Sequence, residues 1–241
     1  MKFYLKERNG DQRIFTILGF KFAYTRRRGR RSPGAMVSPL EFKLDKARIA
    51  SVHRAAFELI ADGDICIDCG CNAGAVTDIF LLKGAVTHAF EPHPYLFEEL
   101  CRKYAGENKI KLLNVAVWDR NTRMDLHVQK VKGTSVVNLE GTTLFGNRID
   151  TRVETTCNVD VVDLTEFIAA LGKRVKILKI DVEGAEFEII EKILATGLYE
   201  KIDHIFCETH PHFFPDGVSR LAAIEEKIKQ KGITNIHLDW V

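Results

Sequence analysis

Apolar and polar residues follow two alternating patterns from about residue 45 onward. Short runs such as DICID (64–68), AVTHAFE (85–91) and VKILKID (175–181) are centred on apolar residues, as in strands that are buried on both faces. The segments between these runs carry apolar residues at helical spacing. Short apolar strands that alternate with helices predict βαβ units, and therefore an α/β fold with a mostly parallel sheet and helices on both faces.

The pattern also sets approximate bounds for the elements. Between residues 124 and 164 the sequence changes to β-rich segments separated by glycines, which indicates an inserted region of strands and loops over one edge of the domain. The expected helices cover 44–61, 75–82, 95–104, 164–171, 185–194 and 219–229, and the expected strands cover 64–68, 85–91, 109–117, 175–181, 204–209 and 235–240.

Residues 1–40 differ from the rest and are expected to form a basic arm ahead of a main domain at 41–241. The segment 13–24 is rich in β-branched and aromatic residues, which favours a short hairpin or an extended arm. Residues 1–31 hold ten Lys and Arg and two Asp and Glu, whereas the remaining 210 residues hold 25 basic and 31 acidic residues. The main domain is therefore mildly acidic, and we expect no nucleic-acid partner.

The arm also bears on where the protein acts. Its aromatic and aliphatic residues precede five arginines at 26–31, a composition suited to an anionic membrane surface, a solvated arm or an oligomer contact. No apolar run approaches the ~20 residues that span a bilayer, and the N-terminus shows no secretory signal. We expect a cytoplasmic protein, with peripheral contact between residues 13–31 and the inner face of the membrane as a hypothesis.

Six cysteines are present, and two of them, Cys66 and Cys69, form a C-x-x-C. A second close pair, as in a zinc ribbon, is missing. Because the two cysteines lie in a predicted buried strand and the turn after it, we expect small buried thiols in a reducing compartment and no metal site.

A glycine-containing turn follows the first predicted strand and precedes a helix. It reads D-C-G-C-N-A-G, with Gly70 and Gly74 four residues apart and Asp68 two residues before the first glycine. Glycines let a backbone turn tightly and approach a ligand, and open α/β sheets bind ligands at this end of their strands. A dinucleotide site would read G-x-G-x-x-G. The carboxylate of Asp68 instead favours a nucleotide-like cofactor that carries a cationic amino group.

Glu91 ends the next predicted strand, 21 residues after Gly70. An acidic residue at this distance is suited to accept hydrogen bonds from the two ribose hydroxyls of an adenosine. A turn residue before Pro92 is the alternative, and the pairing with the glycine turn favours ribose binding.

Asp181 ends the strand at 175–181, where the carboxyl ends of parallel strands meet. We expect it to face the reacting groups of a bound ligand, where a carboxylate can orient a hydroxyl and take its proton. Alternatively, Asp181 and Glu183 stabilise the N-terminus of the helix that begins near Gly184. Lys179, within the same apolar strand, is expected to pair with a carboxylate rather than to contact substrate.

The tip of the next strand carries Glu208, His210 and His212. His210 has a pKa range suited to a general base at neutral pH, and Glu208 lies beside it at the same sheet edge. These side chains could instead hold a metal ion, although H-x-H spacing is weak evidence. A loop histidine without a catalytic part is the third interpretation.

Four motifs together resemble the FkbM-type methyltransferases. The most specific is L-K-I-D-V-E-G-A-E at 178–186, and the resemblance covers about residues 60–212. The others are D-C-G-C-N-A-G at 68–74, F-E-P-H-P at 90–94 and N-V-A-V at 114–117.

The resemblance implies the class I methyltransferase fold, a Rossmann-like, mostly parallel sheet of seven strands, and S-adenosylmethionine as cofactor. The cofactor's methionine end would lie near Asp68, Gly70, Asn72 and Gly74, its ribose at Glu91 and its adenine near Val115 and Ala116. Thr134 and Ser135 resemble the family's small-residue segment near the acceptor site, and Glu183 is a further candidate for substrate contact. Members of the family mostly methylate hydroxyls, often of sugars, glycolipids or small metabolites, and the fold does not decide the acceptor.

Three functional classes are therefore compared. An O-methyltransferase with catalytic residues Asp181, His210 and Glu208 explains all of the motifs. A catalytically silent module that binds a partner or a membrane would not need Asp68, Glu91 and Asp181 together. A nicotinamide-dependent oxidoreductase lacks its G-x-G-x-x-G signature.

Overall fold

The computed structural model describes residues 5–9, 12–17, 20–25, 38–130, 137–145 and 153–240. Only the backbone is described for the first three of these segments and for 129–130, 137–141 and 153–155. The chain divides into two compact units, Met1–Ser38 and Pro39–Val241. Each unit is described by itself.

The first unit contains a three-stranded antiparallel meander. Its strands are β1 (Leu5–Asn9), β2 (Gln12–Ile17) and β3 (Phe20–Thr25), paired in that order. The register sets Asn9 opposite Gln12 and Ile17 opposite Phe20. The hairpin that the β-branched and aromatic composition favoured is thus present, with one further strand before it.

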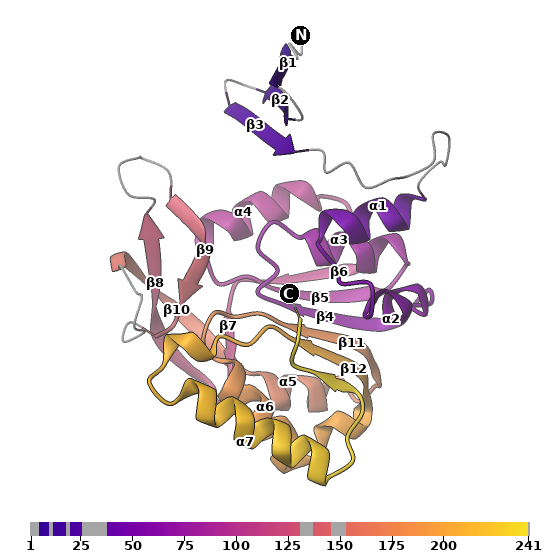
Figure 1. The fold of residues 1–241 in the computed structure, drawn as a ribbon, viewed down its shortest axis with the longest axis vertical. Helices are drawn as coiled ribbons and strands as arrows, with labels where there is room; N and C mark the ends of the chain where they lie inside the picture. The colour runs from indigo at the N-terminus through magenta and orange to yellow at the C-terminus, as the bar shows by residue number, and fades with distance from the viewer. Residues whose placement is uncertain are drawn as a thin grey trace. The chain divides into compact units, whose positions relative to one another are not determined.

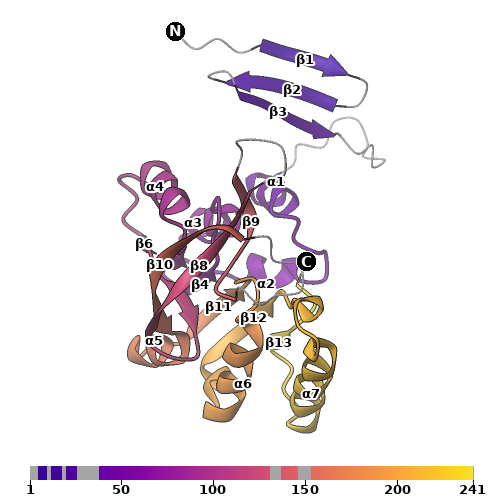
Figure 2. The ribbon, with the colours of Figure 1, turned by 90° about the vertical axis from the view of Figure 1, so that its left-hand side faces the viewer.

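The second unit is built on a six-stranded sheet in the order β13-β12-β11-β4-β5-β6, and all of its pairings are parallel. Figures 1 and 2 show α1, α3 and α4 on one face of this sheet and α5, α6 and α7 on the other. The strands are β4 (Ile65–Cys69), β5 (Val86–Phe90), β6 (Ile110–Leu113), β11 (Val175–Ile180), β12 (Ile202–Cys207) and β13 (Ile236–His237). The helices are α1 (Pro39–Lys46), α2 (Arg54–Glu58), α3 (Ala75–Leu82), α4 (Pro94–Lys103), α5 (Leu164–Ala170), α6 (Glu186–Thr196) and α7 (Gly217–Gln230), with short 3-10 helices at Leu198–Lys201 and Pro211–Phe213.

The predicted α/β architecture is therefore confirmed, with one correction to the strand count. The sheet has six parallel strands among the described residues, where seven mostly parallel strands were expected. Successive residues of a strand point to opposite faces, and β11 accordingly sends Ile177 into the core beside α3 and Leu178 into the core beside α6. Burial on both faces is why the central strands are rich in apolar residues.

The inserted region forms a second sheet in the order β7-β10-β8-β9. These strands are β7 (Ala116–Trp118), β8 (Thr122–Lys130), β9 (Val137–Thr143) and β10 (Val153–Asp163). A small core that includes Leu126, Leu144 and Val161 packs within this sheet. The single strand predicted over 109–117 is wrong, because it is divided between β6 and β7. Asn114 lies at the break, where its Nδ2 donates to the carbonyls of Glu91 and Pro92.

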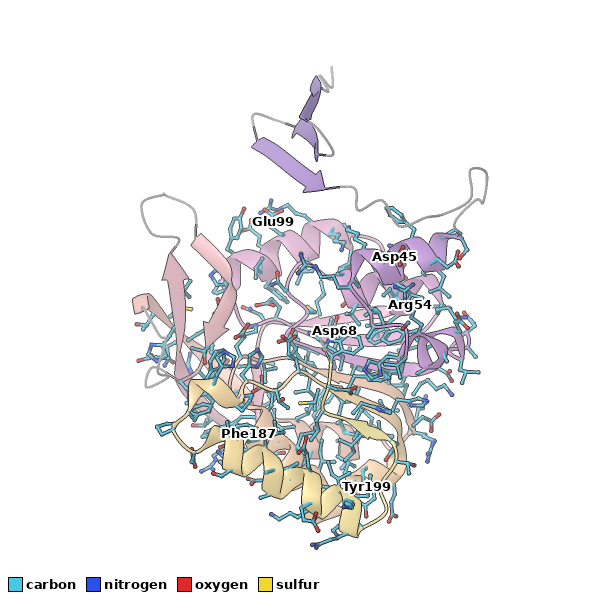
Figure 3. All side chains as sticks on the ribbon, in the orientation of Figure 1. Asp45, Arg54, Asp68, Glu99, Phe187 and Tyr199 are labelled. Carbon is cyan, nitrogen blue, oxygen red and sulfur yellow. The ribbon has the colours of Figure 1, made fainter. Side chains whose placement is uncertain are left out.

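The predicted helix over 44–61 is also wrong, because it is interrupted between α1 and α2. Arg48 adopts a left-handed backbone conformation with φ 58°, which a continuing helix does not allow. The interruption lets Ile49 enter the same core as Leu44, although these positions lie on different sides of a continuous helix. Arg54 stabilises the loop by donating to the carbonyl of Ile49 at 3.0 Å and to Asp45 at 2.8 Å, and Figure 3 labels both charged residues.

Within the described residues, no helix is long and apolar enough to cross a membrane.

Candidate active site

A cavity of about 550 Å³ opens at the carboxyl ends of β4, β5, β11 and β12. Each of these strands ends in a residue or turn that lines the cavity, and one wall is completed by β7 and another by the loop after α1. The acidic lining residues are Asp68, Glu91, Asp181, Glu183 and Glu208. Parallel strands bring their carboxyl ends to one edge, which is how residues 140 positions apart along the chain, Asp68 and Glu208, come to face one space.

The turn after β4 is held by close packing of the chain against itself. Gly70 has φ +72°, and a Cβ there would lie 1.8 Å from the carbonyl oxygen of Asp181. Gly74 has φ +77°, and a Cβ there would lie 2.2 Å from the hydroxyl of Tyr104. Gly70 lines the cavity, whereas Gly74 is not among the described residues that line it. The two glycines are thus required by the protein's own packing, in addition to any approach of a ligand at Gly70.

Asp68 is fully buried at the end of β4 and labelled in Figure 3. Its Oδ2 accepts a hydrogen bond from Thr77 on α3 at 2.7 Å. Its Oδ1 lies 3.5 Å from Nζ of Lys179 and has no hydrogen-bond partner among the described residues. A buried carboxylate oxygen without a hydrogen bond is costly unless a ligand supplies one.

Lys179 on β11 is the cation at the centre of the site. Its Nζ donates to the carbonyls of Gly70 at 2.8 Å and Cys69 at 3.2 Å, and lies 3.2 Å from Oδ2 of Asp181. Burial lowers the pKa of Lys179, but the charges of Asp181 and Asp68 outweigh it and raise the pKa well above its usual value. The expectation that this lysine pairs with a carboxylate is confirmed.

Glu91 is buried at the end of β5, with both carboxylate oxygens held by backbone N–H groups. Asn72 donates to Oε2 and His93 donates to Oε1, each at 2.9 Å. Asn72 reaches this position with a left-handed φ of 47°. Burial raises the pKa of Glu91 to about 7 despite these two hydrogen bonds. The carboxyl group is therefore fixed in orientation and close to its titration point at neutral pH.

The wall next to Glu91 is apolar. Val115 and Ala116 line the cavity together with Val117 and Phe90, and Leu126 and Leu144 extend the wall from the second sheet. The break between β6 and β7 turns this segment into the cavity. A flat apolar ligand such as a purine would be desolvated here.

The opposite end of the cavity is charged. Asp181, Glu183 and Glu208 line it there, whereas His210 is not among the described residues that line the cavity. His210 is buried next to these carboxylates: its Nδ1 lies 3.1 Å from Oε1 of Glu186, and its Nε2 lies 3.7 Å from Glu183 and 3.8 Å from Glu208. Glu186 is buried at the start of α6, where it also accepts from the backbone N–H groups of Val182 and Gly184. Glu186 thus holds His210 and the turn after β11 in place at once.

His210 and Glu208 both have pKa values above their usual range. Burial lowers the pKa of His210, but the hydrogen bond to Glu186 and the charges of Glu186, Glu183 and Asp181 raise it to about 9. Burial, followed by the charge of Asp181, raises the pKa of Glu208. His210 is therefore charged at neutral pH, which argues against the general base expected from its free pKa and leaves the carboxylate of Glu208 as the candidate proton acceptor.

The possible metal ligands in this region are not the set of Glu208, His210 and His212 that the sequence suggested. Asp181, Glu183 and His210 offer ligand atoms that lie within 4.8 Å of one another, whereas His212 is exposed and outside this group. Asp181 is meanwhile paired with Lys179 and His210 with Glu186.

The remaining predicted residues fall into two sets. Thr134 and Ser135 lie outside the described residues. Cys66 and Cys69 are free and buried, and burial raises the pKa of the Cys66 thiol to about 12 and that of the Cys69 thiol higher still. Neutral buried thiols agree with the expected packing role.

Several residues that were not predicted from the sequence also line the cavity. Lys46 lines it from the end of α1, Ala47 and Arg48 line it from the loop after α1, and Trp240 lines it after β13. None of them belongs to a motif. The left-handed conformation of Arg48, which brings this loop to the cavity, has no signature in the sequence, because arginine rarely adopts it.

A family model and several solved structures are similar to this chain. The family model described as Methyltransferase FkbM domain matches residues 68–233. No curated protein matches the chain. Three solved structures are similar. A putative rRNA methylase from Clostridium thermocellum has a TM-score of 0.41 and 10% identity over 82% of this chain and 84% of that chain. TYW2 from P. horikoshii, in complex with MeSAdo, has a TM-score of 0.24 and 16% identity over 45% and 37%. Trm5b from Pyrococcus abyssi has a TM-score of 0.37 and 11% identity over 96% and 55%.

Proposed function

Since the chain belongs to the family of FkbM methyltransferase domains, we propose that it transfers a methyl group from S-adenosylmethionine to a hydroxyl of a sugar, a glycolipid or a small metabolite. One observation carries the proposal. Asp68, Glu91, Asp181 and Glu208 line a single cavity of about 550 Å³ at the carboxyl edge of a parallel sheet, where α/β proteins bind nucleotide-like ligands.

The cavity fits this cofactor at three points. The buried Oδ1 of Asp68, which lies 3.5 Å from Lys179 but accepts no hydrogen bond among the described residues, is suited to accept from the ammonium group of the methionine part. Glu91, oriented by two backbone N–H groups, is suited to accept from the ribose hydroxyls. Val115 and Ala116 offer an apolar surface to the adenine. When bound, the cofactor supplies an electrophilic methyl group on a sulfonium centre.

The residues around Asp181 would act on the acceptor. Lys179 holds the carboxylate of Asp181 at 3.2 Å, which preorganises it to accept a hydrogen bond from the acceptor hydroxyl. Glu208, whose pKa is raised by burial and by Asp181, is suited to take the hydroxyl proton. The charged His210, 3.8 Å from Glu208, offsets part of the negative charge of the three neighbouring carboxylates. Its role is thus electrostatic positioning.

The test is an acceptor screen that measures formation of S-adenosylhomocysteine, with wild type and Asp181→Asn compared on the first acceptor found. We expect turnover with hydroxylated acceptors, and a loss of about a hundredfold or more in kcat in the variant because the acceptor is no longer oriented. The affinity for S-adenosylhomocysteine should change by less than about threefold. Turnover with amines but with no hydroxyl compound would contradict the proposed reaction class.

A further inference from the structure

A second group of ligand atoms lies outside the cavity, where the loop that follows α1 meets the end of β13 and the segment after it. It consists of His53, His237 and Asp239, whose ligand atoms lie within 4.8 Å of one another. The ring centroids of His53 and His237 are 5.4 Å apart, and Nε2 of His53 lies 3.4 Å from Oδ1 of Asp239. Two imidazoles and one carboxylate from distant parts of the sequence thus converge on one point.

His53 provides a second, independent observation that points to a ligand. Its side chain is 4% exposed, and its ring packs against Phe206 and Trp240 with centroid distances of 4.9 and 6.0 Å. Its Nε2 is buried and makes no hydrogen bond within the described part of the chain. Buried polar groups in folded proteins nearly always have a partner, and coordination to a metal ion would supply one here.

The donor set selects the kind of ion. Imidazole nitrogens and a carboxylate oxygen are ligands of zinc and its first-row neighbours, whereas Mg²⁺ and Ca²⁺ prefer oxygen ligands throughout. The side chain of Asp239 is 72% exposed, which gives an ion access from solvent and leaves room for a water ligand. We propose that His53, His237 and Asp239 bind a divalent first-row transition metal ion, with Zn²⁺ as the first candidate.

The two segments that carry this site also line the cavity. Arg48 and its neighbours line the cavity from the loop that carries His53, and Trp240 lines it directly after Asp239. An ion held by both segments fixes two walls of the cavity relative to each other. This inference does not depend on the reaction that the cavity supports.

The test is a calorimetric titration of the chelator-treated, full-length protein with ZnCl₂. We expect one tight site per chain, and a dissociation constant at least about tenfold weaker in Asp239→Asn and in His237→Gln, because each variant removes one ligand. Asp239 is exposed, so Asp239→Asn should fold normally, and its melting temperature without metal should equal that of the wild type. Zinc should raise the melting temperature of the wild type but not that of Asp239→Asn.

Two matched variants separate this site from other metal ligands. His212→Gln removes an exposed histidine outside the group, and Asp181→Asn removes a ligand of the cluster in the cavity. Both should keep the wild-type affinity for zinc. The proposal is overturned if the wild type shows no saturable zinc binding, if Asp239→Asn binds as tightly as the wild type, or if Asp181→Asn abolishes binding.

Discussion

The carboxylates around His210 affect the stability of the fold as well as the chemistry of the site. His210 has a pKa raised from 6.5 to about 9, because its contacts with carboxylates outweigh the effect of burial. A histidine whose pKa is higher in the folded than in the unfolded state stabilises the fold fully below pH 6.5, and this contribution disappears as pH rises through 9. Glu91 has a pKa of about 7, so its contribution to the pH dependence of stability is small above pH 7.5.

The free energy of unfolding should accordingly fall between pH 7.5 and 9.5. We expect a decrease of about 2 kcal/mol that depends on His210, from its shift to about 9. Urea denaturation at several pH values measures it, with His210→Asn as the comparison. The variant should show a much flatter dependence over this range, and a dependence as steep as that of the wild type would refute the assignment.

The sequence identified single residues well where a motif marks the end of a strand. Asp68, Glu91, Asp181 and Glu208 all line the cavity, as their positions after predicted strands led us to expect. It could not assign Glu186, because a buried glutamate that binds both a turn and a histidine looks like any acidic residue in the first turn of a helix.

At the scale of elements, the turn after β4 depends on the absence of a side chain at Gly70 and at Gly74, and Gly70 is the one in contact with β11's end. Gly63 offers a matched comparison, since it also has a positive φ of +82° but has nothing within 4 Å of the site of a Cβ. Gly63→Ala should cost about 1–2 kcal/mol from backbone conformation alone. Gly70→Ala should cost at least about 2 kcal/mol more, because its Cβ would meet the carbonyl of Asp181.

Urea denaturation of both glycine variants measures these costs. Gly70→Ala should also weaken cofactor binding, because relief of the contact displaces Asp181 or the turn, whereas Gly63→Ala should not. Equal losses of stability in the two variants would show that packing against β11 is not what requires glycine at this position.

The elements also show why pattern alone was insufficient in two places. The apolar periodicity predicted one helix over 44–61. In the structure the apolar residues of that segment are buried instead by two short helices and a loop that places Ile49 in the core. The run over 109–117 is mostly apolar, and only the contacts of Asn114 with the turn after β5 show where β6 ends and β7 begins. Long-range packing decided both cases.

At the scale of the whole molecule, the basic arm belongs to a compact unit separate from the unit that carries the cavity. The two functions proposed for them should therefore be separable. We propose that residues 13–31 contact an anionic membrane, since five arginines follow a segment rich in aromatic and aliphatic residues.

Replacement of Arg26, Arg27, Arg28, Arg30 and Arg31 by glutamine tests this proposal in the full chain. Sedimentation with phosphatidylglycerol vesicles should show at least about a tenfold loss of binding, because each basic residue contributes about 1 kcal/mol near such a surface. Neutral phosphatidylcholine vesicles are the control, and affinity for S-adenosylhomocysteine should not change. Unaltered binding to anionic vesicles would remove the membrane hypothesis.

The architecture was predictable at this scale because alternation of strands and helices permits few arrangements. The order of the strands places β4 and β11 side by side, and this adjacency joins Asp68, Lys179 and Asp181 into one cluster. For the second sheet, the sequence predicted a β-rich inserted region but not the strand pairing. The pairing of β7 with β10 joins residues more than 40 positions apart in the sequence.

The most direct test of the account is calorimetric titration with S-adenosylhomocysteine, performed on the wild type, on Glu91→Ala and on Glu98→Ala, which alters an exposed glutamate of α4. Circular dichroism should first show that all three proteins are folded. The account predicts micromolar binding by the wild type and by Glu98→Ala, and a loss of at least about tenfold in Glu91→Ala, because the ribose loses its acceptor. A folded wild-type protein that does not bind the ligand, or a Glu91→Ala variant that binds it equally well, would contradict the account.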